Sequence, residues 1–310
     1  PQGVGVPSPF LACRITMLNR YKSPAIVLAT LLLVAACATQ SINLPSITAA
    51  PTGERLPGKI IWRDLLTNDP AASQRFYGEL FGWEFESAGS AYTLIRQNGA
   101  LIGGMVDTVA LNNRSDISQW VPLMSVADVD AAVARFKAAD GKVVAAPTDV
   151  GSRGTLAVVR DAEGALLGLL QTADGDPADR EPAINGFLWD ELWTTDVDKA
   201  TAFFSDLAGL QAANWDTDTD QGSGASYRLL KGGDTPRVGI LPNPVDGLDP
   251  VWVSYLRVES PSTITARVAE LGGSVMAEAQ PRPLGGEVAL IKGPSGAGIA
   301  LQTWPLSSEE

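Results

Sequence analysis

The chain has 310 residues, with 23 Lys and Arg against 35 Asp and Glu, and a formal net charge of −12. This acidic balance argues against nucleic acid and anionic lipid surfaces as partners, because both are negatively charged. The chain contains no histidine and only two cysteines, Cys13 and Cys37, so a thiolate or imidazole metal site and a disulfide framework are excluded from the folded part that we expect.

Residues 1–36 have the pattern of a secretory signal whose true start is Met17. Two basic residues precede an apolar run at 25–36, which is shorter than the roughly 20 residues that a membrane span needs. The run ends in Val34-Ala35-Ala36-Cys37, and small residues before a cysteine resemble a bacterial lipobox. That resemblance implies acylation of Cys37 and anchoring to the cell envelope, at the outer membrane in a Gram-negative cell. The alternative is an uncleaved helix or an ordinary signal peptide.

Two further stretches have the composition of connecting segments. Residues 38–57 are rich in Ser, Thr, Pro and Ala without a packing pattern, which predicts a flexible tether. Residues 174–184 are polar and contain two prolines, which is typical of a domain linker. The expected organisation is therefore a signal segment (1–36), the lipidated cysteine with its tether (37–57), a first domain (58–173), the linker (174–184), a second domain (185–305) and a tail (306–310).

One stretch of sequence occurs twice at a constant spacing. Residues 62–69, WRDLLTND, return at 189–196 as WDELWTTD. The landmark pairs are each 127 residues apart: Trp62 and Trp189, Asp69 and Asp196, Phe76 and Phe203. A constant offset across three landmarks indicates a duplicated unit.

Each copy is expected to be a strand followed by a helix. Asp69 is placed to cap the free backbone N–H groups of a helix whose first residue is Pro70, and Gly82 is suited to the left-handed turn that ends it. Asp196 and Gly209 have the same places in the second copy.

The order of one strand, one helix and three strands is expected four times. Asn98-Gly99 lies between two strands of the first module and is typical of a hairpin turn. The turns 161–164 and 293–296 lie before the last strands of the second and fourth modules. The four modules span roughly 58–110, 118–173, 185–242 and 250–304.

Four such modules in two pairs resemble the vicinal oxygen chelate superfamily, which includes glyoxalase I, extradiol dioxygenases and bleomycin-resistance proteins. The resemblance is carried by the helix starts Asp69…Phe76-Tyr77 and Asp196…Phe203-Phe204 and by the turns 161–164 and 293–296. Within it, the chain is most similar to two-domain glyoxalase-like antigens and hydroxylases. The resemblance implies an α+β fold of tandem domains, in which four βαβββ modules pair into two cup-shaped mixed sheets with helices outside and a site inside each cup.

The chain departs from this family at the metal positions. Metal-dependent members place His, Gln or Glu on the first and last strands of each module. Here the first-strand positions hold Trp62, Val121, Trp189 and Val253, and the last-strand positions fall on about Gly103, Gly168, Gly239 and Ala300. None of these side chains binds a metal, so we expect no metal and no other cofactor.

Aromatic and acidic side chains remain in the expected cups. Alternation places Trp62 and Asp64 on one face of the first strand, and Trp189, Glu191 and Trp193 on one face of its repeat. The resemblance implies that these faces point into the cups. Indole rings beside a carboxylate suit a flat or cationic organic ligand, through stacking, cation–π attraction and charge pairing.

Core packing is the alternative interpretation of the same residues. In that case each tryptophan fills an empty metal position, and the acid pairs with an arginine such as Arg96 or Arg228.

Three functions remain open on this evidence. The leading interpretation is an envelope-anchored protein, monomeric or homodimeric, that binds a small organic molecule much as bleomycin-resistance proteins do. The second is a metal-independent lyase, isomerase or hydrolase in which Asp64 or Glu191 is the general base, because an apolar cup raises the pKa of a carboxyl group. The third is a structural envelope lipoprotein.

Overall fold

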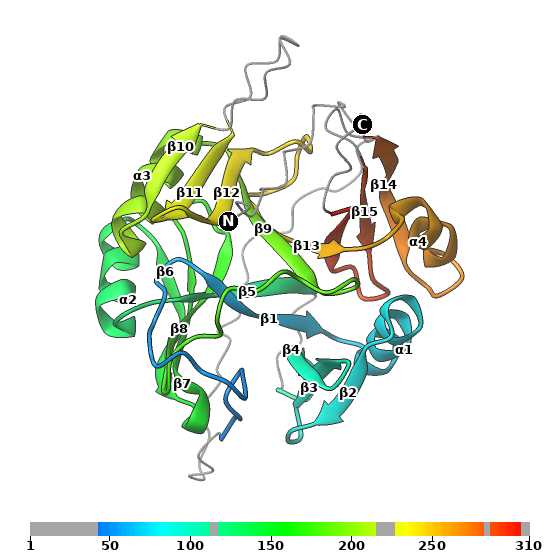
Figure 1. Ribbon diagram of the computed structural model, residues 1–310, viewed down its shortest axis with the longest axis horizontal. Coiled ribbons are helices and arrows are strands. Elements are labelled where there is room, and N and C mark those ends of the chain that lie inside the picture. Colours follow the sequence, from blue (N-terminus) through cyan, green and yellow to red (C-terminus); the bar gives the residue numbers. More distant parts are fainter. Residues whose placement is uncertain (1–42, 112–116, 215–226, 282–285, 305–310) are drawn as a thin grey trace.

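The computed structural model describes residues 43–111, 117–214, 227–281 and 286–304 (Figure 1). The expectations for the signal segment, for Cys37 and for the tail lie outside these residues. Within the described part, no helix has both the length and the apolar character of a membrane span.

The described residues form two eight-stranded mixed sheets, each with two helices. The first sheet contains β1 (Ile60–Thr67), β2 (Glu84–Ser87), β3 (Tyr92–Gln97), β4 (Ala100–Asp107), β5 (Gln119–Ser125), β6 (Lys142–Asp149), β7 (Gly154–Arg160) and β8 (Leu166–Thr172). The second contains β9 (Phe187–Thr194), β10 (Gln211–Asn214), β11 (Arg228–Gly232), β12 (Thr235–Pro242), β13 (Val251–Arg257), β14 (Ser274–Pro281), β15 (Glu287–Lys292) and β16 (Gly298–Gln302). The helices are α1 (Pro70–Phe81), α2 (Val129–Ala138), α3 (Val197–Ala208) and α4 (Pro261–Val268), and a short 3₁₀ turn, η1, spans Gly151–Arg153.

Both sheets have the same topology. The strand orders are β2-β3-β4-β1-β5-β8-β7-β6 and β10-β11-β12-β9-β13-β16-β15-β14. In each sheet the first strand of one module pairs antiparallel with the first strand of the next, β1 with β5 and β9 with β13. The last strand of a module pairs parallel with its first, as β4 does with β1. This confirms the predicted α+β fold of tandem domains built from four βαβββ modules.

Local signals in the sequence explain where the repeated helices begin and end. Asp69 accepts a hydrogen bond from the backbone N–H of Ala72 (3.0 Å), and Asp196 accepts the equivalent bond from Lys199 (3.0 Å). Gly82 and Gly209 end these helices with φ of 70° and 65°, a conformation that glycine adopts without strain.

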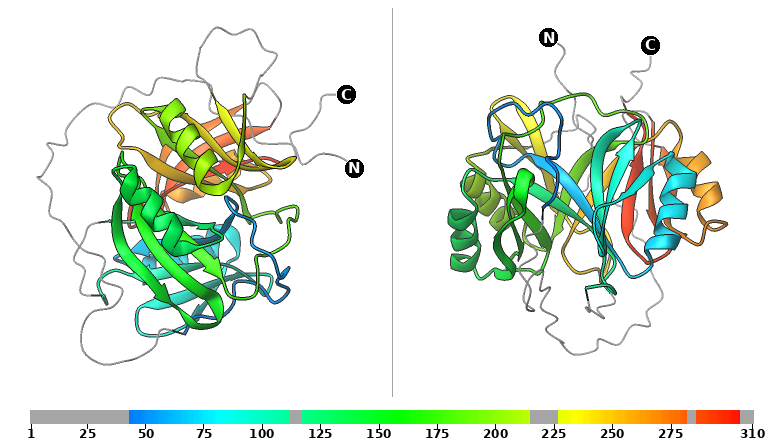
Figure 2. Two further views of the ribbon diagram at one scale, coloured as in Figure 1. Left: turned by 90° about the vertical axis from the view of Figure 1, so that its left-hand side faces the viewer. Right: turned by 90° about the horizontal axis from the view of Figure 1, so that it is seen from below.

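The two domains pack through their helices and share their cores. Helix α1 lies beside α4, and α2 lies beside α3, in both Figure 1 and Figure 2. One shared core contains Phe136 of α2, Phe204 of α3 and Trp252 of β13, and the other contains Phe76 of α1 and Val268 of α4. Separating the domains would expose both cores to water, so the pair is expected to unfold as one unit.

A buried ion pair joins the domains at equivalent positions of the repeat. Arg63 of β1 and Asp190 of β9 are 127 residues apart in sequence, and their side chains form an ion pair in which Asp190 is only 2% exposed. Ser254 also donates a hydrogen bond to Asp190 (2.6 Å), and the Arg63 guanidinium lies 4.7 Å from the centre of the Phe187 ring. Two identical copies would place like charges here. Because these two positions of the repeat carry opposite charges instead, the first strands of the two domains can pack against each other here.

Residues 43–57, which we name the strap, differ from the flexible tether that the sequence predicts. The strap has no regular helix or strand, but Leu44 and Ile47 are buried, with 7% and 4% of their surface exposed. Leu56 donates its backbone N–H to the buried Asp176 carboxylate (2.6 Å). Two apolar side chains in a polar segment, without periodicity, gave no packing signal in the sequence.

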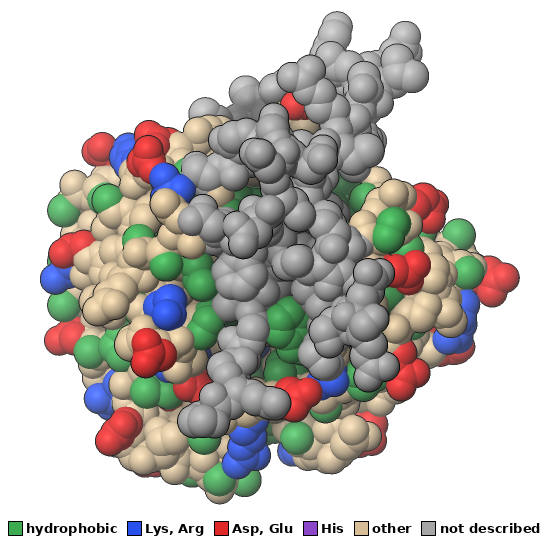
Figure 3. Space-filling model, turned by 45° about the horizontal axis from the view of Figure 1, so that its top comes forward, with side chains coloured by type: hydrophobic (Ala, Val, Ile, Leu, Met, Phe, Trp, Pro, Cys, Tyr) green, Lys and Arg blue, Asp and Glu red, His purple; other side chains and the backbone are tan. Residues whose placement is uncertain are grey.

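Charges on the surface are mixed. On the face shown in Figure 3, acidic side chains are interspersed with single lysines and arginines. Among the described residues, the exposed large hydrophobic side chains are Val109 and Leu248. Candidate sites must therefore be sought inside the sheets and at the domain junctions rather than in an exposed apolar patch.

We expect Asp190→Ala to lower the free energy of unfolding by about 2–4 kcal/mol, because it leaves the Arg63 guanidinium, which is only 13% exposed, without its counter-charge. Urea denaturation measures this change. Arg135→Ala is the matched control, since Arg135 and Asp206 also pair across the domains but are exposed, and its effect should stay below about 1 kcal/mol. Equal effects of the two variants would contradict a structural role for the buried pair.

Candidate functional site

Each sheet has one face without helices, and the sequence-predicted site residues lie there. On this face the first domain gathers Trp62 with Leu94, Leu123 and Leu170, and the strap residue Ile47 packs against them. In the second domain Trp189 and Trp193 gather with other side chains that come mainly from strands. We call these two interiors the first cup and the second cup. The predicted faces of β1 and β9 therefore do point into the cups, but the five predicted side chains are buried there.

A hydrogen-bonded triad forms the floor of the first cup. The Trp62 indole N–H donates to Asp64 Oδ1 (2.9 Å) and to the Tyr92 hydroxyl (3.1 Å). The Tyr92 hydroxyl in turn donates to Asp64 Oδ1 (2.7 Å). Burial raises the pKa of the Asp64 carboxyl group, while the positive charge of Arg153 and these hydrogen bonds oppose the rise. Burial also raises the pKa of Tyr92, so its hydroxyl stays protonated and remains a donor.

Arg153 is the cation of the first cup. It comes from η1 in the second module and is only 1% exposed. Its guanidinium carbon lies 4.4 Å from the centre of the Trp62 ring, and Nη1 donates to the Tyr92 hydroxyl (2.8 Å). Its Nε donates to the strap carbonyl of Pro45 (3.1 Å), which brings the strap over this part of the cup.

The direct partners of Arg153 are all neutral. Within the described part of the chain, no carboxylate lies within ion-pairing distance of its guanidinium, and Nη2 is buried without a hydrogen-bond acceptor. Buried charges in proteins are normally paired, because an unpaired one loses its hydration without compensation. Arg153 is thus the feature of the cup that packing leaves least satisfied.

The arginines proposed from the sequence as partners of the cup acids are elsewhere. Arg96 pairs with Glu86, and Arg228 pairs with Asp198, in partly exposed ion pairs. The cation near Asp64 is Arg153, which approaches it through the Tyr92 hydroxyl. It lies in a turn far along the chain, so strand alternation carries no signal for it.

The second cup also has a buried acid that is hydrogen-bonded to tyrosine and tryptophan, but different residues surround it. The fully buried Glu191 accepts hydrogen bonds from the hydroxyls of Tyr255 (2.5 Å) and Tyr227 (3.2 Å) and from the Trp193 indole (3.3 Å). The Trp189 indole donates to the Tyr227 hydroxyl (3.1 Å). Trp, acid and Tyr thus occupy equivalent places in both cups, and in the second cup further aromatic groups contact the acid.

Glycines on the last strands leave room for the two tyrosine hydroxyls. A Cβ atom at Gly104 would lie 2.0 Å from the Tyr92 hydroxyl, and one at Gly239 would lie 2.1 Å from the Tyr227 hydroxyl. Gly104 pairs with Asp64 as Gly239 pairs with Glu191. The position equivalent to Gly239 is therefore Gly104. The sequence placed this position at about Gly103, one residue too early, because Gly104 faces Asp64 and Tyr92 in the cup whereas Gly103 faces the Arg63 carbonyl and Phe187.

The residues of the cups do not fit a transition metal. Gly168 lies beside Leu123 and Ala300 lies beside Tyr255, and these are the last-strand positions at which the resemblance implied metal ligands. In the part of the chain that the structure describes, each cup floor offers one carboxylate, already bonded to its own tyrosine and tryptophan. Across the described residues, no three Asp, Glu or Cys side chains converge on one point, and the whole sequence lacks histidine.

We expect Gly104→Ala to lower the free energy of unfolding by about 1–3 kcal/mol, because the new methyl group would displace the Tyr92 hydroxyl from the floor of the cup. Gly298→Ala is the matched control, since a Cβ at this strand position meets no atom within 4 Å. Thermal and urea unfolding of both variants measures the difference. If Gly104→Ala proved as stable as its control, the assigned position of Tyr92 would be incorrect.

Comparison with known proteins places the chain in a family. The family model described as "Glyoxalase/Bleomycin resistance protein/Dioxygenase superfamily" matches residues 59–169. A protein of Mycobacterium bovis named "Putative glyoxylase CFP32" is 30% identical over 241 residues, covering 76% of this chain and 91% of the relative. The "Anthracycline biosynthesis protein DnrV" of Streptomyces peucetius is 29% identical over 262 residues, covering 79% of this chain and 93% of the relative.

Solved structures share the fold at low identity. The Mn(II)-bound glyoxalase from Novosphingobium aromaticivorans has a TM-score of 0.55 at 17% identity, covering 80% of this chain and 83% of that one. Homoprotocatechuate 2,3-dioxygenase from Arthrobacter globiformis also has a TM-score of 0.55, at 14% identity, covering 84% of this chain and 83% of that one. The repeated modules, the paired sheets and these relatives together show that the chain belongs to the glyoxalase/bleomycin resistance protein/dioxygenase superfamily.

Proposed function

We propose that the protein binds a small organic anion, such as an aromatic carboxylate, in the first cup and without a metal ion. The observation that carries this proposal is the guanidinium of Arg153, which is buried over the Trp62 ring with only neutral partners. Arginine binds carboxylates through charge-assisted hydrogen bonds, and Nη2 has a donor to spare. A carboxylate at this point would supply a direct counter-charge, in addition to the Asp64 carboxylate on the far side of the Tyr92 hydroxyl.

The surroundings of Arg153 suit the apolar part of such a ligand. The Tyr92 ring lies 5.5 Å from the guanidinium carbon, next to the indole of Trp62, so two aromatic groups flank the charge. Leu123 and Leu170 add apolar walls. Ligand sites typically combine an apolar lining with a few fixed polar groups, which is the composition of the first cup.

Access to the first cup requires the strap to move. Leu44 and Ile47 lie in or beside the cup, and the strap is attached there through the Leu44 N–H to the Val150 carbonyl (2.8 Å) and through Pro45 to Arg153. Residues 52–56 of the strap are held by further hydrogen bonds to Thr172, Asp174 and Asp176, so the part that would move is the one that contains Leu44 and Ile47. We infer that a ligand takes the place of strap side chains, so that the strap acts as a displaceable cover.

This proposal reverses the ligand charge expected from the sequence for the first cup. The place over the Trp62 ring, which would suit a cationic ligand, is taken by Arg153. In the second cup, Glu191 is surrounded by donors from its own chain, which favours a structural role for Trp189, Glu191 and Trp193.

The relatives support a small organic ligand. The family model covers the domain that contains Trp62, Asp64, Tyr92 and Arg153. One relative is named for anthracycline biosynthesis and another as a glyoxylase, so proteins similar to this chain carry names tied to small organic molecules.

Catalysis in the same cup is the second candidate function. The raised pKa of Asp64 is the observation that favours it, because a carboxylate with a raised pKa is a stronger base. The bonds described above use Oδ1 of Asp64, which leaves Oδ2 as the atom for accepting a proton. A metal-independent isomerase or lyase would need this atom, whereas a binding protein would not.

Calorimetric titration with benzoate tests the binding proposal. Binding should be saturable, should weaken about tenfold or more in Arg153→Met, and should be absent for benzamide, which lacks the charge. Arg96→Met is the matched control, since Arg96 is a partly exposed arginine of the same domain. Asp64→Asn should retain benzoate binding but would abolish turnover of any substrate if Asp64 were a base. Equal benzoate affinity in wild type and Arg153→Met would contradict the proposed site.

We also propose that the protein is anchored to the cell envelope by acylation of Cys37. The apolar run followed by the small residues before this cysteine supports the proposal. In cells fed a radiolabelled fatty acid, wild-type protein should carry the label and fractionate with membranes, whereas Cys37→Ala should be unlabelled. An unlabelled wild-type protein would contradict the anchor, whatever the outcome in the first cup.

A further inference from the structure

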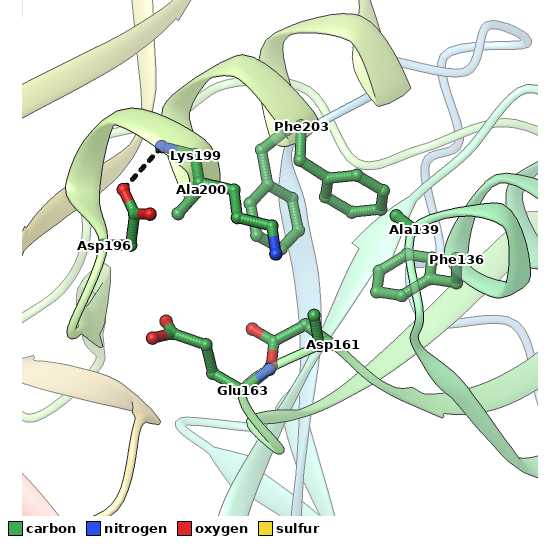
Figure 4. A pocket seen from close by; sticks show the side chains of 10 residues that line it. Phe136, Ala139, Asp161, Glu163, Asp196, Lys199, Ala200 and Phe203 are labelled. Atoms are coloured by element: carbon green, nitrogen blue, oxygen red, sulfur yellow. Dashed lines mark hydrogen bonds between the residues drawn. The ribbon is translucent and has the colours of Figure 1, made fainter.

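A hollow lies at the junction of the two domains, separate from both cups. It opens to solvent between α2, the turn 161–164 and the start of α3 (Figure 4), and its space, with the open solvent at its mouth included, is about 410 Å³. Its lining is almost wholly apolar where it meets solvent, and its inner wall is formed by Phe136, Phe203 and Phe204. Both domains contribute to the lining, so the hollow exists only when they are packed together.

The aromatic wall is rigidly organised. The rings of Phe136 and Phe203 are 4.8 Å apart at 79°, and those of Phe203 and Phe204 are 5.1 Å apart at 84°. These edge-to-face contacts join the first domain to the second, and Phe204 also packs against Trp252 at 5.3 Å. A wall held in this way offers a preformed surface against which one further ring can pack.

The rim of the hollow is predominantly acidic. Glu163 reaches across the junction to the hydroxyls of Thr194 and Thr195, and Asp196 and Asp161 each accept backbone hydrogen bonds through Oδ1. These donors are neutral. The Arg160 guanidinium, which donates to the Gly164 carbonyl (2.6 Å), offsets part of the charge of Asp161, so Glu163 and Asp196 supply most of the negative charge at the rim.

Lys199 is the one basic side chain among the lining residues, and it forms no ion pair with another described residue. Figure 4 shows it extending from α3 toward the opening beside Asp161 and Glu163. Three carboxylates against one ammonium give the rim a net charge of about −2 when all four are ionised.

We propose that this hollow is a second ligand site, which takes a small aromatic amine in its cationic form. The aromatic ring would pack against Phe136 and Phe203, and the ammonium group would lie at the rim among Asp161, Glu163 and Asp196. The proposal does not rest on ligand binding in the first cup. It assigns the opposite ligand charge, uses different residues, and joins groups from both domains.

The charges at the rim disfavour binding of an aromatic anion in the hollow. An anion at the rim would be repelled by three carboxylates and attracted by one ammonium group. A cation would be attracted by the three carboxylates and repelled by the ammonium group. Lys199 then competes with the ligand for the same negative charges, so its removal should strengthen binding of a cation and weaken binding of an anion. This opposite response distinguishes the two ligand classes.

Ligand-observed NMR titration of the full chain with 2-phenylethylammonium tests the site, with phenylacetate as the ligand of opposite charge. The amine should bind, phenylacetate should not, and Lys199→Ala should strengthen amine binding about two- to fivefold. Lys137→Ala is the matched control, because Lys137 is an exposed lysine of α2 outside the lining, and its affinity should equal that of wild type.

Two variants that fill the hollow from opposite domains locate the binding. Ala200→Leu on α3 and Ala139→Leu after α2 should each weaken amine binding about tenfold or more, while Arg153→Met in the first cup should leave it unchanged. Circular dichroism checks that each variant is folded. If one Leu variant is unfolded, the other Leu variant provides the test. The proposal is overturned if the amine does not bind, if phenylacetate binds instead, or if a folded Leu variant binds the amine as well as wild type.

Discussion

The first cup is organised by one constraint, which is that a carboxyl group and a guanidinium group are buried together without a direct ion pair. Asp64 and Arg153 both lie inside the fold, and the Tyr92 hydroxyl stands between them, donating to one and accepting from the other. A hydroxyl is suited to this place because it is donor and acceptor at once. Gly104 is needed opposite Asp64 because any Cβ there would occupy the position of the hydroxyl.

The second domain shows how the same fold holds a different interior. Tyr227 and Gly239 repeat the arrangement of tyrosine and glycine around Glu191, and Tyr255 and Trp193 add further donors to that acid. The duplicated backbone has therefore been kept while the side chains around the acid have diverged. The same divergence appears at the domain interface, where Arg63 and Asp190 occupy one position of the repeat with opposite charges. Fold alone does not determine what each cup binds.

The fold could be predicted from the sequence because its signals are local or repeated. The spacing of 127 residues revealed the duplication, and Asp69 and Gly82 mark the ends of α1 through backbone rules that depend on few neighbours. Alternation correctly placed Trp62 and Asp64 on one face of β1, because side chains along a strand point to opposite faces in turn.

The chemistry of the site was harder to predict because it depends on tertiary contacts. Arg153 reaches Trp62 from a turn about 90 residues later, and no periodic pattern marks such a contact. The strap was interpreted as a tether because Leu44 and Ile47 are isolated apolar residues in a polar stretch. The choice of Gly103 rather than Gly104 was a register error of one residue, in a strand pair that the structure shows to be shifted near Ile95.

We propose that the polar floor of the first cup is satisfied by its own residues and by a counter-anion for Arg153, and not by a metal. The most direct measurement is calorimetric titration of the purified protein with Mn²⁺, Fe²⁺, Ni²⁺ and Zn²⁺, followed by metal analysis after dialysis. We expect no stoichiometric metal binding, because each cup floor offers, among the residues that the structure describes, a single carboxylate that is already hydrogen-bonded. One tightly held metal ion per chain, lost in Asp64→Ala, would contradict it.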